Sequence, residues 1–179
     1  ASAYSRADLW IQSRFQDALQ KVNEQIAVYR FDLVSQAVYD FFWNEYCDWY
    51  LELSKPVLWD ETAPQEQKNA TRYTLLSILE RSLRLAHPLM PFITEEIWQK
   101  AAPLLGIEGD TIMLQPYPLE DSSCRTAEVD AEIEWVKAVI LALRNIRGEL
   151  NISPAKAMPV LFSKGTGHDK KHLQNYQQY

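Results

Sequence analysis

The sequence predicts a mainly α fold, an antiparallel helical bundle with a small α/β tail at its C-terminal end. Apolar residues recur every three or four positions in several long segments, which is the spacing of one face of a helix. Glycine occurs only five times in 179 residues, and this scarcity argues against a turn-dense all-β fold. No run of 18 apolar residues is present, which argues against a membrane span.

The first two helices are predicted at residues 7–28 and 33–53. The second, with Asp32 as its N-cap, is apolar nearly all round, so we place it in the centre of the bundle. We expect it to end near Lys55 and Pro56, because the residue before a proline avoids the helical conformation. The first helix carries its apolar residues mainly on one face: Leu9, Ile11, Phe15, Leu19, Val22 and Ile26.

The next two helices are predicted at residues 70–86 and 91–102, with Pro91 in the first turn of the second one. Residues 103–128 then contain five Pro or Gly residues, which indicate a long connection. Within this connection, residues 111–115 are predicted to be extended.

A fifth helix is predicted at residues 129–150, followed by Pro154 as a stop. Residues 158–162 are predicted to form a short strand, and a last helix begins at His168. We therefore divide the chain into a helical bundle at 1–118 and a tail at 119–179 that holds the fifth helix and a partial α/β unit.

The charges are distributed unevenly along the chain. The net charge of −6 argues against indiscriminate binding of nucleic acid. Residues 144–179, however, contain six of the 18 Lys and Arg residues and only two of the 24 Asp and Glu residues. A polyanion would therefore favour the C-terminal end of the chain.

Compartment is indicated by the cysteines and by the start of the chain. Cys47 and Cys124 are too few for a disulfide framework, so we expect reduced thiols and a cytoplasmic location. The chain begins with Ala1 and lacks a basic region followed by an apolar one, so we expect no signal peptide. The missing Met suggests an excised piece of a longer chain.

Catalytic and metal sites find weak support in the residue pattern. Glu45, Asp48 and Glu52 share one helix face, where carboxylates can bind metal or do acid–base work, but such acids more often pair with basic residues of neighbouring helices. His168 and His172 are four residues apart, and two ligands do not complete a zinc site. We expect neither catalytic residues nor a metal in this chain.

Binding of nucleic acid is indicated by two features of the sequence. Arg144 and Arg147 lie three residues apart at the end of the fifth helix, and arginine suits contacts with phosphate or base edges; compensation of the helix dipole is the alternative. Exposed aromatic rings can stack on unpaired bases, but core packing must hold most of them, so we expect one or two to be free. The candidates are Phe31, Phe41, Phe42, Trp43, Tyr46, Trp49 and Tyr50.

Five ordered blocks carry a resemblance to a known family. They read RFD, FFWNEYCDWYLELSKP, HPLMPFITEEIW, TIMLQPYP and RNIRGELNISP, and they occupy residues 30–32, 41–56, 87–98, 111–118 and 144–154. In this order and spacing they resemble the anticodon-binding region that follows the catalytic part of bacterial valyl-tRNA synthetases, which belong to the class I aminoacyl-tRNA synthetase family. The resemblance runs from about Asp8 to Phe162.

The resemblance implies a monomeric module that binds tRNA(Val) and binds neither a membrane nor DNA. The parent enzyme would ligate valine to its tRNA with ATP and magnesium in a separate domain. Its H-I-G-H and K-M-S-K-S motifs do not occur here, so this chain should be inactive alone and hold no cofactor. By the same resemblance the tRNA-binding residues are Arg30, Gln36, Phe41, Leu114, Gln115, Arg144, Arg147 and Lys156, with Phe41 as the stacking ring.

Three alternatives remain open from the sequence. The chain could be the same module of an isoleucyl or leucyl enzyme, because HP-x-MPF-x-TEE-x-W also recurs in those enzymes. It could instead be a helical scaffold for protein partners with no RNA role. An enzyme built on Glu45, Asp48 and Glu52 is the third alternative.

Overall fold

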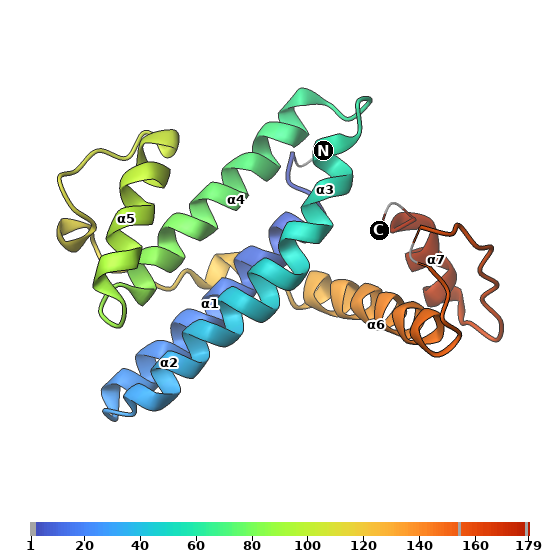
Figure 1. Cartoon of the computed structure of the whole chain (residues 1–179), viewed down its shortest axis with the longest axis horizontal. Helices are drawn as coiled ribbons and strands as arrows, with labels where there is room; N and C mark the ends of the chain where they lie inside the picture. The colour runs from blue at the N-terminus through green and yellow to red at the C-terminus, as the bar shows by residue number, and fades with distance from the viewer. Residues whose placement is uncertain (1–2, 154, 178) are drawn as a thin grey trace. The chain divides into compact units, whose positions relative to one another are not determined.

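The computed structural model describes residues 3–153, 155–177 and 179, and it divides the chain into two compact units, 1–126 and 127–179. The sequence predicts the boundary between the two parts after residue 118. Each unit is helical, which confirms the mainly α prediction (Figure 1). Among the described residues, no helix is both long and apolar enough to cross a membrane.

The first unit is a bundle of long helices joined by short connections. Helix α1 packs against α2 and against α4, and α4 packs in turn against α3 and α5 (Figure 1). Its helices are α1 (Arg6–Ala27), α2 (Phe31–Tyr39), the π-helix η1 (Asp40–Tyr50), α3 (Leu51–Trp59), α4 (Gln65–Ala86) and α5 (Pro91–Ala101). Three 3₁₀ turns follow: η2 (Ala102–Leu105), η3 (Ile112–Leu114) and η4 (Ser122–Cys124).

Helix α1 supplies the centre of this core. Its N-terminus is closed by a capping box between Ser5 and Asp8, which satisfies two backbone N–H groups. Asp8 is buried and also accepts hydrogen bonds from Tyr50 (2.6 Å) and Thr71 (2.9 Å), so it ties η1 and α4 to α1. Fully buried apolar side chains line the inner face of α1: Trp10, Ile11, Phe15, Leu19 and Val22.

The segment from α2 to α3 differs from its prediction in two ways. The helix runs on to Trp59, past Pro56, so the predicted end at Lys55 and Pro56 is wrong. Proline in a helix costs about 3 kcal/mol, and the burial of Val57 beyond it offsets this cost. The central position is also wrong in part, because this segment exposes one side that includes Leu33, Tyr39 and Trp43.

The connection after α5 is not extended where the sequence predicted it. Residues 111–115 contain the 3₁₀ turn η3, which Thr111 caps by accepting a hydrogen bond from the Met113 N–H (3.2 Å). A single buried side chain, Ile112, anchors the turn, and local side-chain capping replaces the cross-strand partner that a strand would need.

The second unit consists of α6 (Ala127–Glu149) and α7 (Gly167–Asn175) with an irregular connection between them. Residues 158–162, predicted as a strand, have no regular structure and are exposed, because no described segment pairs with them and a lone strand leaves its backbone groups unbonded. The α/β character of the tail is therefore wrong in the described residues. Pro154, the predicted stop of the fifth helix, lies outside them.

Candidate functional site

A groove of about 680 Å³ with mainly apolar walls lies in the first unit, between the α2–η1 segment and the α4–α5 hairpin. We call it the aromatic groove. One wall presents Tyr39, Phe42 and Trp43, and the other presents Leu89, Met90 and Ile93. Polar groups are few and include Gln36 and Thr94. A concave apolar site with a few polar groups is typical of ligand-binding surfaces.

Two aromatic rings on one wall of the groove are stacked. Tyr39 and Trp43 lie with their ring centroids 6.3 Å apart and their planes at 11°, and about half of each side chain is exposed. They are four residues apart, the spacing that brings side chains together on one helix face. Trp43 lies within the π-helix η1, a geometry that is rare and often found at functional sites. The open ring faces form a platform on which another flat ring can stack.

The floor of the groove belongs to the hydrophobic core beneath it. Leu83 lines the groove and also packs with Trp98, Ala102 and Ile112, while Ile97 lies against the same cluster. Ile112 is the buried anchor of η3. The groove and the η3 turn are therefore built around one apolar cluster, which fixes them relative to each other.

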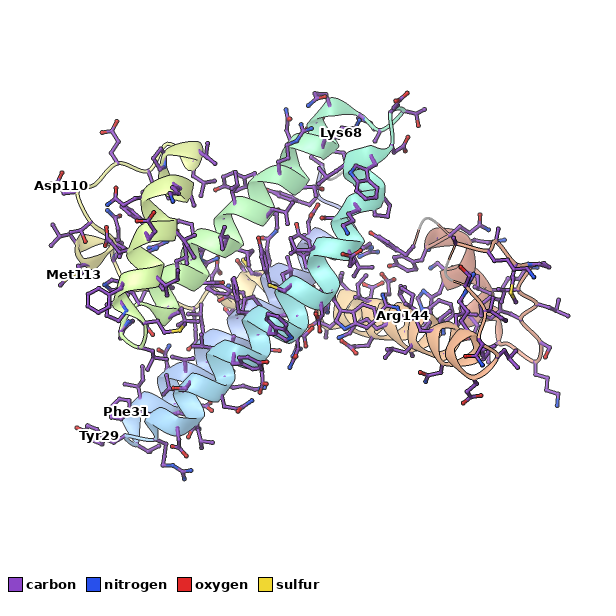
Figure 2. The ribbon with its side chains drawn as sticks, in the orientation of Figure 1. Tyr29, Phe31, Lys68, Asp110, Met113 and Arg144 are labelled. Carbon is purple, nitrogen blue, oxygen red and sulfur yellow. The ribbon has the colours of Figure 1, made fainter. Side chains whose placement is uncertain are left out.

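The η3 turn lies in a loop, residues 108–117, that we call the η3 loop. Met113 and Leu114 at its tip are about three-quarters exposed, whereas Ile112 beside them is buried. Figure 2 marks this loop by Asp110 and Met113, beside α5. Leu114, one of the residues implied by the resemblance, is therefore presented at the surface of the first unit, and Gln115 beside it is partly exposed.

Gln115 has its position defined by a close approach to Gly109. The Nε2 of Gln115 donates a hydrogen bond to the carbonyl of Glu108 (3.4 Å). A Cβ at Gly109 would lie 2.4 Å from that Nε2, so any other residue here would require the Gln115 side chain to move. The Gly109 position is therefore part of how the loop presents its polar side chain.

Arg30 lies at the corner between α1 and α2, and its sequence neighbours Tyr29 and Phe31, which Figure 2 labels, are exposed. Its guanidinium donates to Asp32 from Nε (2.9 Å) and Nη2 (2.7 Å). This pair lowers the pKa of Asp32 to about 2 and raises the pKa of Arg30. Tyr29 adopts a left-handed backbone (φ 57°), which is uncommon for a bulky residue.

The implied residues of the second unit behave differently from one another. Arg144 and Lys156 are exposed. Arg147 is partly buried and donates to the carbonyls of Ser153 (2.9 Å) and Lys156 (3.1 Å). Its guanidinium thus holds the chain that follows α6, as a charged group at a helix C-terminus commonly does.

Phe41 is not placed as the resemblance implied. Its side chain is 4% exposed, and its ring meets Phe15 edge to face with centroids 5.3 Å apart. The stacking role of Phe41 is therefore corrected to a role in the core, because neither ring face is open to a base. Among the seven candidate rings, Phe31 and Trp43 are the exposed ones. Tyr39 is also exposed, but the sequence prediction did not include it. Its i, i+4 spacing from Trp43 was the signal in the sequence.

Glu45 and Glu52, on the acidic face of η1 and α3, each have a basic partner. Arg14 lies 4.0 Å from Glu45, and Lys55 lies 2.5 Å from Glu52. In the described ranges, 3–153, 155–177 and 179, no group of three or more His, Cys, Asp or Glu side chains has a geometry that holds a metal. His168 and His172 bring their Nε2 atoms within 3.1 Å of each other, and no third ligand joins them there.

Comparison with known proteins gives two findings. Residues 8–162 match the family described as the anticodon-binding domain of tRNA ligase. The chain is 49% identical over 177 residues to a valine–tRNA ligase of Coxiella burnetii and 47% identical over 168 residues to one of Acinetobacter baylyi. These matches cover 99% and 94% of the chain but 19% and 17% of the relatives, so the chain spans about a fifth of their length. The chain therefore belongs to the family of anticodon-binding domains of tRNA ligases.

Proposed function

We propose that this chain is the tRNA-recognition module of a valine–tRNA ligase and that it binds the anticodon region of tRNA(Val) as a monomer. The observation that carries the proposal is the near-complete match to two valine–tRNA ligases within the anticodon-binding family. The parent enzyme would join valine to tRNA(Val), with ATP and magnesium held in a catalytic part outside this chain. Neither H-I-G-H nor K-M-S-K-S occurs in these 179 residues, so the chain alone would bind RNA without charging it.

The aromatic groove supports this function by its shape and chemistry. An unpaired anticodon base would stack on the Tyr39–Trp43 platform, since stacking is worth about 1–3 kcal/mol per base. Gln36 lines the same groove and, by releasing Asp40, to which it now donates (2.8 Å), would offer its amide to a base edge. Leu114 and Gln115 would contact the anticodon loop from the neighbouring η3 loop.

The cations would contact the RNA backbone. Arg30 would exchange Asp32 for a phosphate, which suits the same planar fork of donors. Arg144 and Lys156 would contact the stem from the second unit, where the basic residues of the chain are concentrated. Arg147 is assigned to holding the chain after α6 and not to phosphate.

Measurement of affinity for tRNA(Val) between about 50 and 200 mM salt tests this function. We expect affinity to fall steeply with salt, because each cation that meets a phosphate releases a counterion. Arg144→Gln should reduce the slope of log K against log salt by about one. Glu134→Gln, which removes a charge from the exposed part of the same helix, is the control and should not reduce it.

Transcripts of isoleucine and leucine tRNAs, measured beside tRNA(Val), distinguish the related possibilities. Preference for one of them would assign the chain to that enzyme instead. Absence of tRNA binding even at 50 mM salt, about the lower end of that range, would contradict the proposal and favour a scaffold for protein partners.

A further inference from the structure

The η3 loop is held in place by the buried side chain of Ile112 and by hydrogen bonds from two neighbouring helices. At one end, the Nε2 of Gln99 on α5 donates to the carbonyl of Asp110 (2.8 Å). At the other end, the Nη1 of Arg84 on α4 donates to the carbonyl of Pro116 (2.7 Å). Between these points the loop carries its exposed tip, Met113 and Leu114, which contributes little burial of its own.

Glu95 makes the central attachments of this loop. Its Oε2 accepts hydrogen bonds from the hydroxyl of Thr111 (2.7 Å) and from the backbone N–H of Ile112 (3.2 Å). Its Oε1 accepts from Gln99 (2.7 Å), the same side chain that holds Asp110. A carboxylate is suited to this task, because its two oxygens accept several bonds at once and bonds to a charged acceptor are strong. These donors also keep the pKa of Glu95 low, so the carboxylate stays ionised at neutral pH.

The attachment acts on residues that face outward. The Ile112 N–H, which donates to Glu95, is the first backbone donor of the η3 turn and has no partner within the turn. Leu114 and Gln115 lie two and three residues further along the chain. The tip itself is exposed, so its direction depends on the buried Ile112 and on this capping of the turn. Exposed side chains make little packing contact within the chain, so their direction is of consequence for a binding partner.

We propose that Glu95 is a positioning residue for RNA recognition, holding the η3 loop so that Leu114 and Gln115 meet the anticodon loop in a single orientation. The inference rests on the proposed function. It adds a residue that touches no RNA and acts through two that do. Ordering the loop before binding raises affinity, because less conformational freedom is lost when the complex forms.

The test uses the 179-residue chain and two RNA probes, the anticodon stem-loop of tRNA(Val) and the same stem-loop with abasic anticodon nucleotides. The variants are Glu95→Ala, Glu95→Gln and Glu96→Ala. Glu96 is the matched control, because it lies on the same helix with the same charge but pairs with the exposed Lys100 (2.6 Å). Thr111→Val removes one donor to Glu95, together with the acceptor of the Met113 N–H, and replaces Glu95→Ala if that variant does not fold. Amide hydrogen exchange at Ile112 is measured in parallel.

For Glu95→Ala we expect about a tenfold loss of affinity for the intact stem-loop. Affinity for the abasic probe should be unchanged, and exchange at Ile112 should be faster. Glu95→Gln should retain most of the affinity, since its amide oxygen can accept both loop donors, and Glu96→Ala should behave as the parent chain does.

The positioning role would be overturned if Glu95→Ala left the ratio of the affinities for the intact and abasic stem-loops unchanged. It would also be overturned if Glu96→Ala changed this ratio as much as Glu95→Ala does. Slow exchange at Ile112 in Glu95→Ala would overturn it as well. If the unsubstituted chain binds both probes with equal affinity, that result would instead contradict the proposed function. The exchange rate at Ile112 would still decide whether Glu95 holds the loop.

Discussion

The indole N–H of Trp98 donates a 2.8 Å hydrogen bond to Oε1 of Glu80, a carboxylate that is 1% exposed. The other oxygen of Glu80 accepts from Arg84 through Nη2 (2.8 Å) and Nε (3.2 Å). Arg84 also donates to the carbonyl of Pro116, so the buried carboxylate lies at the junction of α4, α5 and the η3 loop. This junction is the base on which the proposed RNA-binding surface is assembled.

Removing the buried carboxylate should destabilise the fold strongly. Glu80→Ala leaves the Trp98 N–H and a mostly buried Arg84 without their acceptor, and we expect a loss of about 3 kcal/mol in the free energy of unfolding. Urea denaturation followed by circular dichroism measures this loss. Glu96→Ala breaks an exposed pair of the same i, i+4 spacing and should cost less than about 0.5 kcal/mol. Equal losses in the two variants would show that burial of Glu80 contributes nothing.

Substitutions of Trp43 and Phe41, two residues apart in the sequence, should distinguish effects on RNA binding from effects on stability. Trp43→Ala removes half of the exposed platform, so the affinity for tRNA(Val) should fall by about tenfold while the free energy of unfolding changes little. Phe41→Ala removes a buried ring and should cost about 3–5 kcal/mol of stability. Binding titrations and urea denaturation of both variants provide the comparison.

Trp59 offers a matched control for this pair. It is exposed to about three-quarters and lies outside the aromatic groove, near Lys55. Trp59→Ala should therefore leave the affinity for tRNA(Val) unchanged. If it lowers affinity as much as Trp43→Ala does, the loss reflects general removal of surface tryptophan and not stacking in the groove.

The N-terminus of α7 should respond to acid at an unusually low pH. Asp169 accepts hydrogen bonds from the hydroxyl and N–H of Thr166 and from the Trp135 indole (2.9 Å), and these donors lower its pKa from 3.8 to about 2. Because the pKa in the folded chain lies below that in the unfolded chain, the cap contributes fully above about pH 4 and is lost as pH falls through about 2.

The Trp135 indole resonance reports this transition in a nuclear magnetic resonance titration. We expect it to shift with a midpoint near pH 2. Asp169→Asn removes the titrating group and should abolish the shift. A midpoint near 3.8, the ordinary value for an aspartate, would contradict the capping arrangement.

The sequence alone determined the helical class and the positions of most helices. Apolar spacing, Pro91 at a helix start and the scarcity of glycine are local signals, and local signals suffice to place amphipathic helices. It also carried the family, since five ordered blocks are a property of the chain and not of its packing. Sequence reasoning identified Arg30, Gln36, Leu114 and Gln115 as candidates, and their binding of RNA stays a prediction.

Only the tertiary structure decided which aromatic rings are open. Phe41 and Trp43 are two residues apart in one aromatic run, yet the first packs against Phe15 and the second borders a groove. The continuation of α3 past Pro56, the loss of the strand at 158–162 and the engagement of Arg147 with backbone carbonyls also depend on partners distant from the local pattern. Burial and pairing are properties of two surfaces together, and a pattern along one chain specifies only one of them.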